Sequence, residues 1–242
     1  MQLTGSAALV TGASRGLGAS LAAELARRGA RVVAVAREAA TLDPVVARIR
    51  EDGFEAHALV ADQGDKDAVY PLVGAATALV GPIDLLVLNA STLGPVPLRE
   101  LVDTECEDFA RVLEVNLLGP FRLTKAVVGS MVVRGAGLVV GLSSDAAVNG
   151  YPGWGAYGVA KAALDQLMKT WAVELEDSGV RFLSIDPGEM DTRMHADAIP
   201  EADRSLLADP AQVAARMVRI LEAAVPPPSG SRLEVPGLES AA

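Results

Sequence analysis

The chain has 242 residues, half of them hydrophobic and 4% aromatic, with 31 acidic against 21 basic side chains and a formal net charge of −10. This composition excludes a disordered chain, and the acidic balance argues against a nucleic-acid partner because a phosphate backbone would repel it. Cys106 is the only cysteine, which excludes an intrachain disulfide and a cysteine metal cluster, and we expect no metal site.

The N-terminal stretch "MQLTGSAALVTG" lacks the basic region and cleavage site of a secretory signal. No run of 18 apolar residues follows anywhere in the chain, so no membrane partner is expected. A single cysteine fits a reducing compartment. We therefore expect a soluble, cytoplasmic protein.

Short β-branched runs alternate with longer alanine-rich segments. The runs show little polar alternation, which is typical of parallel strands buried on both faces. Strands are expected at 7–11, 31–36, 56–61, 84–89, 137–143, 180–185 and 231–235, and helices near 16–28, 42–52, 65–79, 105–133, 157–178 and 210–224. This order predicts one α/β domain over residues 1–242, a Rossmann-type doubly wound parallel β-sheet flanked by helices. The polar, irregular segment 190–209 is expected to form a substrate lid.

The glycine-rich turn "TGASRGLG" (11–18) follows the first strand and opens the first helix. Gly12, Gly16 and Gly18 let the backbone approach a phosphate, and the helix N-terminus offers free N–H groups. The spacing is not G-x-G-x-x-G, and the absence of G-K-[ST] excludes a P-loop. Taken alone, the glycine cluster is also compatible with an ordinary turn.

The second strand ends at Arg37, where a site that prefers NAD carries an acid for the ribose 2′-hydroxyl. A guanidinium there pairs instead with a 2′-phosphate, and Arg15 in the glycine turn approaches from the other side. We therefore expect NADP(H) in preference to NAD(H), the alternative being that both arginines merely face solvent. Asp62 ends the third strand and Asn89 and Ala90 follow the fourth, at the sheet edge where such folds bind ligands. By position alone, Asp62 is also a candidate helix N-cap.

Tyr157 and Lys161 lie four residues apart, on one face of a predicted helix. A neighbouring ammonium stabilises tyrosinate and is expected to lower the pKa of Tyr157 toward the range of acid-base catalysis. The pattern Y-x-x-x-K is short, and on its own it also fits an exposed helical pair. Ser144 lies thirteen residues earlier, after the fifth strand, and we expect this strand to end beside the first so that Ser144 and Tyr157 converge.

Together these motifs resemble the short-chain dehydrogenase/reductase family, in its shorter branch, over about residues 4–193. The resemblance implies an NADP(H)-dependent oxidoreductase that interconverts a small-molecule ketone or aldehyde with an alcohol. It implies four catalytic residues, namely Asn116 in "VNLLG", Ser144, Tyr157 and Lys161. It implies cofactor contacts from Gly12, Ser14, Arg15, Gly16, Leu17, Gly18, Arg37, Asp62, Gln63, Asn89, Ala90, Tyr157, Lys161, Pro187, Gly188, Met190 and Thr192.

The same resemblance implies roles for these residues. Lys161 binds the nicotinamide ribose and, with the oxidised ring, lowers the pKa of Tyr157. Ser144 polarises the substrate carbonyl, Tyr157 transfers the proton and the nicotinamide carries the hydride. Asn116 holds a helix kink and a water that connects Lys161 to a proton relay. The helical segments 105–133 and 157–178 imply a homodimer or homotetramer.

Three stretches depart from the family pattern. "LNAS" stands for N-N-A-G, so that Ser91 either narrows the site near the nicotinamide or caps a turn. "SRLEVPGL" stands at the carboxyl end instead of a strand followed by V-D-G-G. Asp145 and Glu189 flank expected site residues. They are expected either to contact a cationic or hydroxyl-rich substrate or to be solvated loop residues. Further candidate pocket walls are Tyr151, Trp154, Met190, Met194 and His195.

Two other functions keep the same motifs. A catalytically silent, NADP(H)-binding regulatory protein would retain the fold, and an isomerase or dehydratase would retain the tyrosine and lysine. Gly158 lies inside the predicted helix, where it costs about 1 kcal/mol relative to alanine. Close approach of the cofactor or substrate is the expected reason.

Overall fold

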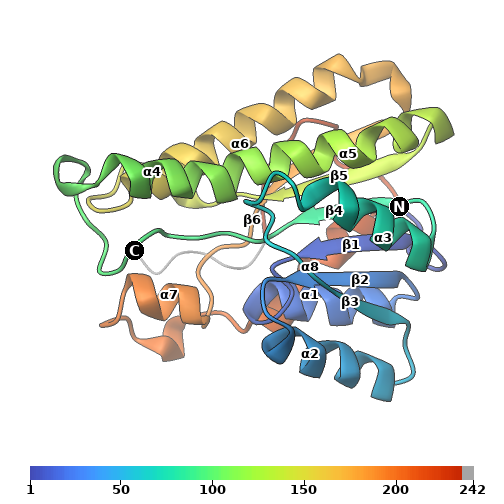
Figure 1. The fold of residues 1–242 in the computed structure, drawn as a ribbon, viewed down its shortest axis with the longest axis horizontal. Helices are drawn as coiled ribbons and strands as arrows, with labels where there is room; N and C mark the ends of the chain where they lie inside the picture. Colours follow the sequence, from blue (N-terminus) through green and yellow to red (C-terminus); the bar gives the residue numbers. More distant parts are fainter. Residues whose placement is uncertain (236–242) are drawn as a thin grey trace.

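A computed structural model describes residues 1–235, so Pro236 to Leu238 of the divergent C-terminal stretch lie outside the described residues. Seven parallel strands form one sheet in the order β3-β2-β1-β4-β5-β6-β7 (Figure 1). The strands are β1 (Ala7–Thr11), β2 (Arg31–Ala36), β3 (Ala56–Val60), β4 (Leu85–Leu88), β5 (Gly137–Leu142), β6 (Val180–Asp186) and β7 (Arg232–Glu234). The predicted fold class, a single-domain doubly wound parallel sheet, is confirmed.

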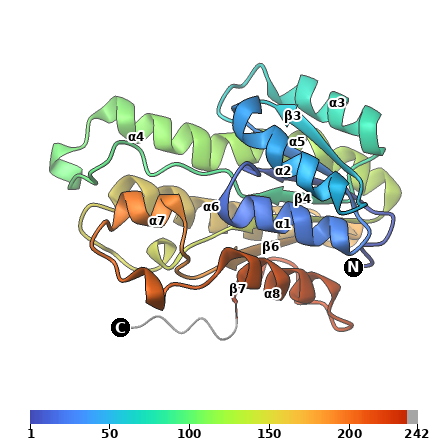
Figure 2. The ribbon, with the colours of Figure 1, turned by 90° about the horizontal axis from the view of Figure 1, so that it is seen from below.

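Helices cover both faces of this sheet (Figures 1 and 2). They are α1 (Gly16–Arg27), α2 (Ala39–Glu51), α3 (Val69–Val80), α4 (Cys106–Leu113), α5 (Gly119–Arg134), α6 (Gly155–Glu174), α7 (Arg193–Ala198) and α8 (Pro210–Glu222). Successive strand side chains point to opposite faces. Ala8 and Val10 of β1 therefore pack with α1, α2 and α8, while Ala7 and Leu9 pack with α3, α5 and α6.

The expected strand order was wrong at one place. β5 pairs with β4 and β6, and β4 separates it from β1. After β3 the chain crosses to the other side of β1, where β4 pairs with β1 and β5 then pairs with β4. Ser144 therefore approaches the glycine turn across the end of β4.

Two predicted segments have more structure than expected. The predicted helix 105–133 divides into α4 and α5 around a π-helical turn, Glu114–Leu118. The segment 190–209 contains α7, and a bridge between Met190 and Ala208 closes its two ends. Within the described part of the chain, no helix combines the length and apolarity needed to cross a membrane.

Candidate active site

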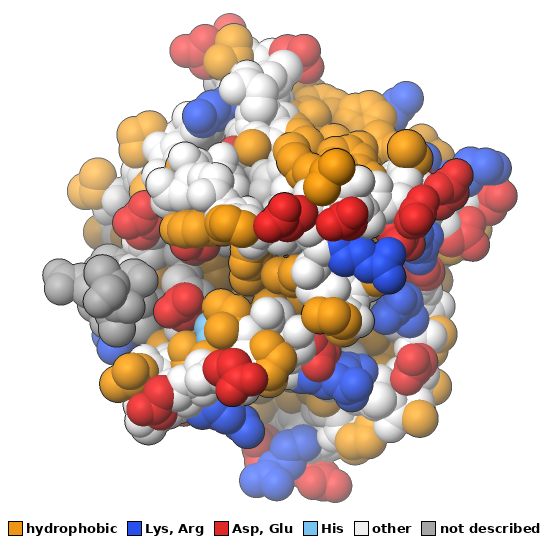
Figure 3. All heavy atoms as spheres, turned by 90° about the vertical axis from the view of Figure 1, so that its left-hand side faces the viewer, with side chains coloured by type: hydrophobic (Ala, Val, Ile, Leu, Met, Phe, Trp, Pro, Cys, Tyr) orange, Lys and Arg blue, Asp and Glu red, His pale blue; other side chains and the backbone are white. Residues whose placement is uncertain are grey.

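A cavity of about 390 Å³ opens at the carboxyl ends of the strands. Figure 3 shows this face, where hydrophobic side chains gather around a hollowed centre and charged side chains surround it. The cavity contacts every predicted cofactor residue except Gly188. It therefore brings together the glycine turn, the ends of β2 to β4, the Tyr157–Lys161 helix and the segment after β6.

The glycine turn has no room for side chains at two positions. A Cβ on Gly18 would lie 2.2 Å from the Gly12 carbonyl oxygen, and one on Gly12 would lie 2.7 Å from the Ala90 Cα. Gly12 also has φ +67°, in the left-handed region that favours glycine. No side chain caps the α1 N-terminus that follows. This bare helix start fits an anionic ligand such as a dinucleotide pyrophosphate.

Arg15 and Arg37 line the outer part of the cavity. Both are exposed, and neither forms an ion pair with another described residue. Asp62 lies nearby but is already engaged, because its carboxylate accepts hydrogen bonds from Gly64 N–H (2.8 Å) and Arg111 (2.7 Å). Burial alone would raise the pKa of Asp62, yet these two donors outweigh it and lower the pKa. Asp62 does not cap a helix, since α3 begins only at Val69.

Three polar side chains fix the ends of the central strands. Thr11 Oγ1 accepts hydrogen bonds from Asn89 N–H (3.1 Å) and Ala90 N–H (3.0 Å), and Asn89 Nδ2 donates to Thr11 O (2.8 Å). Gln63 Nε2 donates to Ala90 O and Val115 O, both at 2.8 Å. Asn89 and Gln63 therefore hold the cavity wall in place.

Asn116 lies in the π-helical turn and is only 1% exposed. Its Oδ1 accepts a hydrogen bond from Thr92 N–H and its Nδ2 donates to Thr92 O, each at 2.8 Å. A π-turn inside a helix is often associated with a functional site. Here it places the Asn116 amide against the loop that follows β4, and the amide pairs fully with the Thr92 backbone.

Tyr157 and Lys161 are 8% and 3% exposed, so they are not the exposed helical pair of the alternative interpretation. Lys161 Nζ donates a 2.6 Å hydrogen bond to Leu142 O at the end of β5 and lies 5.4 Å from the centre of the Tyr157 ring. Burial lowers the pKa of Lys161 to about 8, although the carboxylates of Asp165 and Asp186 act to raise it. The ammonium form therefore still predominates at neutral pH.

The expected lowering of the Tyr157 pKa is absent from this structure. Burial raises the pKa of Tyr157 above its ordinary value, and Asp186 and Asp145 add to the rise. The hydroxyls of Ser144 and Ser91 act in the opposite direction. Desolvation of tyrosinate therefore outweighs the effect of the two hydroxyls, and Tyr157 is protonated, as a proton donor must be.

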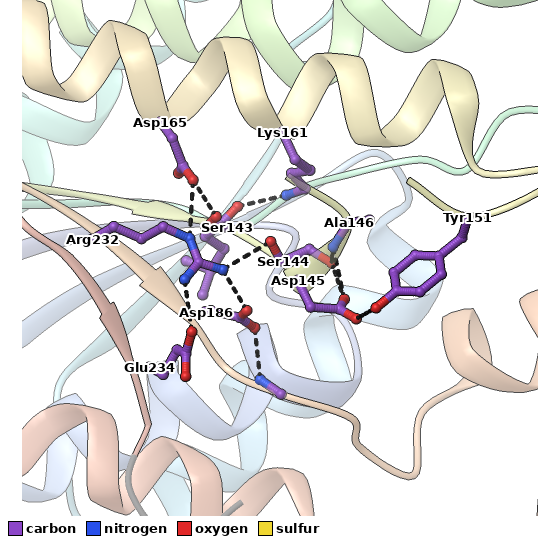
Figure 4. Close-up of polar contacts among 12 residues, drawn as sticks. Ser143, Ser144, Asp145, Ala146, Tyr151, Lys161, Asp165, Asp186, Arg232 and Glu234 are labelled. Atoms are coloured by element: carbon purple, nitrogen blue, oxygen red, sulfur yellow. Dashed lines mark hydrogen bonds and ion pairs between the residues drawn. The ribbon is translucent and has the colours of Figure 1, made fainter. Parts of the chain in front are cut away.

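Two serines follow β5, and their hydroxyls have different partners. Ser143 Oγ donates a 2.7 Å hydrogen bond to the buried Asp165 carboxylate. Ser144 Oγ donates to Asp145 Oδ1 (3.0 Å), and Tyr151 Oη donates to Asp145 Oδ2 (3.0 Å; Figure 4). The Ser144 hydroxyl acts to lower the pKa of Tyr157, whereas Ser143 lines the cavity and is held to α6 by its bond to Asp165.

The remaining pocket candidates are spread around the cavity. Met190 and Met194 line it, whereas Asp145, Tyr151, Trp154, Glu189 and His195 are not among its lining residues. Trp154 packs edge-on against the Tyr157 ring with centroids 5.5 Å apart. His195 Nε2 lies 3.7 Å from Glu189 Oε1. No described group of three or more His, Cys, Asp or Glu side chains is arranged to hold a metal ion.

The structure gives a different reason from the expected one for a glycine at position 158 of α6. A Cβ at this position would lie 2.7 Å from the backbone oxygen of Ala146, in the short helix Asp145–Ala147 that precedes α6. The absence of a side chain therefore serves the packing of α6 against this loop. Close approach of a cofactor or substrate is not needed to explain it.

Gly158→Ala is expected to lower the free energy of unfolding by about 1–3 kcal/mol, as overpacking does in other proteins. This loss would occur although alanine favours a helix by about 1 kcal/mol. Urea denaturation measures the change. Gly74→Ala in α3 is the matched control, because a Cβ there meets nothing within 4 Å and should stabilise the helix. Equal stability changes in the two variants would show that Ala146 yields without cost.

Sequence reasoning missed one residue here and left the role of Ser91 open. Ser91 lines the cavity, as it would if it narrowed the site, and its hydroxyl acts to lower the pKa of Tyr157. Arg232 on β7 contacts Asp165, Asp186 and the Ser144 backbone. An arginine inside a short predicted strand was the available signal, but no motif identifies it.

Comparison with known proteins gives a consistent result. The family model described as short chain dehydrogenase matches residues 6–203. The chain is 37% identical over 208 residues to a short chain dehydrogenase of Pseudocercospora fijiensis, a match covering 84% of this chain and 66% of that protein.

Two solved structures cover nearly the whole chain. A short chain dehydrogenase from Burkholderia cenocepacia in complex with NADP has 30% identity and a TM-score of 0.83, over 97% of this chain and 98% of that one. An NAD⁺-bound xylitol dehydrogenase has 27% identity and a TM-score of 0.86, over 97% and 99% of the two chains.

Proposed function

The chain belongs to the short-chain dehydrogenase family, and on that premise we propose that it is an NADP(H)-dependent oxidoreductase interconverting a ketone or aldehyde with an alcohol. The observation that carries this proposal is the buried Tyr157–Lys161 pair on the wall of the cavity that the glycine turn also lines. The same cavity thus suits a dinucleotide and has on its wall a protonated phenol next to an ammonium group, Tyr157 and Lys161.

The residues around the cavity fit the cofactor part by part. The glycine turn and the α1 N-terminus would hold the pyrophosphate, since their backbone is open to close approach. Arg15 and Arg37 would hold a 2′-phosphate, and Lys161 the nicotinamide ribose. When bound, the cofactor supplies or accepts the hydride.

The protein's own groups would manage the substrate oxygen. In the reductive direction, the Ser144 hydroxyl would turn from Asp145 to donate a hydrogen bond to the carbonyl oxygen, and the Tyr157 hydroxyl would donate its proton to it. The Lys161 ammonium compensates the charge that remains on the phenol oxygen. Leu93, Val96 and Met194 line the cavity and would contact the apolar part of a small substrate.

A two-step assay tests this function. NADPH binding is first followed by its fluorescence, and its consumption is then measured with a panel of ketones and aldehydes. Oxidation of NADPH by at least one carbonyl compound is expected. Binding without turnover would favour a silent regulatory protein, and conversion of substrate without net cofactor consumption would favour an isomerase or dehydratase.

The choice between the two cofactors has its own test. Arg37→Asp is expected to weaken NADPH binding by about 10–100-fold, because a charge-assisted hydrogen bond is lost and a carboxylate faces the phosphate. NADH binding should change by no more than a few fold. Titration calorimetry with both nucleotides measures this, and Arg48→Asp on the exposed part of α2 is the charge-matched control. Equal losses for the two nucleotides would contradict the assignment of Arg37.

The outer faces of α5 and α6 support an oligomer. Phe121 and Val133 on α5 are 36% and 88% exposed, and Val159 and Val173 on α6 are 48% and 74% exposed. These helices lie beside each other on one face of the sheet (Figure 1). Exposed apolar side chains on neighbouring helices are typical of an association surface. We expect a homodimer or homotetramer by light scattering, and the mass of a single 25.0 kDa chain would contradict this.

A further inference from the structure

Arg232 lies on β7 at the edge of the sheet, yet its side chain is only 15% exposed. It extends beneath the ends of β5 and β6 toward α6 (Figure 4). Its guanidinium lies 2.7 Å from Asp186 Oδ2 and 3.2 Å from Asp165 Oδ2, and 3.0 Å from Glu234 Oε1. Asp165 and Asp186 are themselves 7% and 8% exposed, so two buried carboxylates from different elements share this cation.

The same guanidinium also contacts the backbone directly after β5. Arg232 Nη2 donates a 3.0 Å hydrogen bond to the carbonyl oxygen of Ser144. Asp165, its ion-pair partner, accepts from Ser143 Oγ, and Lys161 Nζ donates to Leu142 O. Three successive residues at the end of β5, Leu142 to Ser144, are thus held by side chains from α6 and β7.

The charges of this cluster also act on the proton-transfer residues. Lys161 faces Asp165 on its own helix and Asp186 on β6, and both carboxylates stabilise its ammonium form. Tyr157 faces Asp186 and Asp145. Since Arg232 carries the positive charge that balances Asp165 and Asp186, its removal would leave both carboxylates acting on Lys161 without compensation.

We propose that Arg232 is a positioning residue of the active site, which fixes the Ser144 backbone and balances the buried carboxylates beside Lys161. This inference rests on the proposed function, in which Ser144, Tyr157 and Lys161 act on the substrate oxygen. A residue that only fastened β7 to the sheet would affect stability and nothing else. The two roles therefore predict different results for the same substitution.

The first test compares Arg232→Gln with a matched control. Arg134 also donates to a backbone carbonyl, Ile83 O at 2.7 Å, and lies 3.1 Å from a carboxylate, Asp84, at the amino ends of the strands. Arg232→Gln is expected to lower kcat by about 10–100-fold, as positioning losses do, with NADPH Kd nearly unchanged. Arg134→Gln should lower the melting temperature without lowering kcat. Loss of stability in Arg232→Gln with unchanged kcat would overturn the proposal.

A second readout does not depend on turnover. The chain has four lysines, at positions 66, 125, 161 and 169, so lysine labelled with ¹³C at Cε gives few signals and Lys161→Met identifies the one needed. In Arg232→Gln the titration midpoint of the Lys161 ammonium is expected to rise by about one pH unit, because Arg232 no longer balances the two carboxylates that stabilise the ammonium. An unchanged midpoint would overturn the electrostatic part of the proposal. Failure of the wild-type protein to turn over any carbonyl compound would instead count against the proposed function and leave this titration as the deciding measurement.

Arg232→Lys separates the positioning of the Ser144 backbone from the balance of charge beside Lys161. Lysine keeps the positive charge but cannot contact Ser144 O and both carboxylates in a fixed fork. The Lys161 midpoint should therefore stay near its wild-type value while kcat remains reduced. If the glutamine variant does not fold, the lysine variant decides, and a wild-type kcat would overturn the positioning role.

Discussion

Replacing Tyr157 with phenylalanine is expected to lower kcat by about 10³-fold, the middle of the range for loss of a general acid. Phenylalanine keeps the ring and its edge contact with Trp154, and it removes only the buried hydroxyl. NADPH binding should change little, since the glycine turn and the two outer arginines are untouched. Single-turnover kinetics with saturating NADPH measure the chemical step directly.

Tyr70→Phe is the control for this substitution. Tyr70 lies on α3 and is 61% exposed, so loss of its hydroxyl should leave kcat unchanged. If Tyr157→Phe kept more than about a tenth of the wild-type kcat, general acid catalysis of the usual size could not be assigned to this residue. The proton would then have to come from another donor at the cavity.

The sequence predicted the sheet well because both of its faces are covered. Strands such as β1 and β2 are buried along their length, so they read as continuous apolar runs whose bounds are visible without any contact information. Strand order was harder. Neighbours in a parallel sheet are set by crossovers, and the local sequence of β5 contains nothing that distinguishes β1 from β4 as its partner.

The candidate site divides in the same way. The glycine turn and the spacing of Tyr157 and Lys161 depend on local geometry, and the structure places these residues around one cavity. Ser144 does not line this cavity, but its hydroxyl acts on the pKa of Tyr157. Arg232 is 88 residues from Ser144, and their contact follows only from the pairing of β7 with β6. The raised pKa of Tyr157 also could not be predicted from the sequence, because it comes from burial in the folded structure.

Gly158 shows how a local rule can be read correctly and explained wrongly. The helical penalty of glycine was evident from the sequence, but the close approach expected to explain it was that of a cofactor or substrate. The approaching group is the Ala146 backbone, which belongs to the loop that carries Ser144. The glycine thereby affects the distance between the serine loop and the tyrosine helix.

Replacing Lys161 with methionine is expected to change activity and stability in opposite directions. kcat should fall by about 10²–10³-fold, because the charge that supports proton transfer by Tyr157 is lost. The free energy of unfolding at pH 7 should rise by about 1–2 kcal/mol, since the removed ammonium pays a burial penalty that exceeds the loss of its hydrogen bond to Leu142 O. Urea denaturation measures the stability, with Lys169→Met on the exposed side of α6 as the control.

The pH dependence of this difference gives the sharper result. The pKa of Lys161 falls from 10.5 to about 8 on folding, so below pH 8 the group is protonated in both states and the folded state carries the full penalty. Between pH 8 and 10.5 the unfolded chain binds more protons than the folded one, and the stability contributed by Lys161 rises with pH. Lys161→Met lacks this rise, so its advantage over the wild type should shrink from pH 7 to pH 9.5. A constant advantage across this range would mean that Lys161 keeps its ordinary pKa when buried, and the charge balance inferred for Asp165, Asp186 and Arg232 would have to be abandoned.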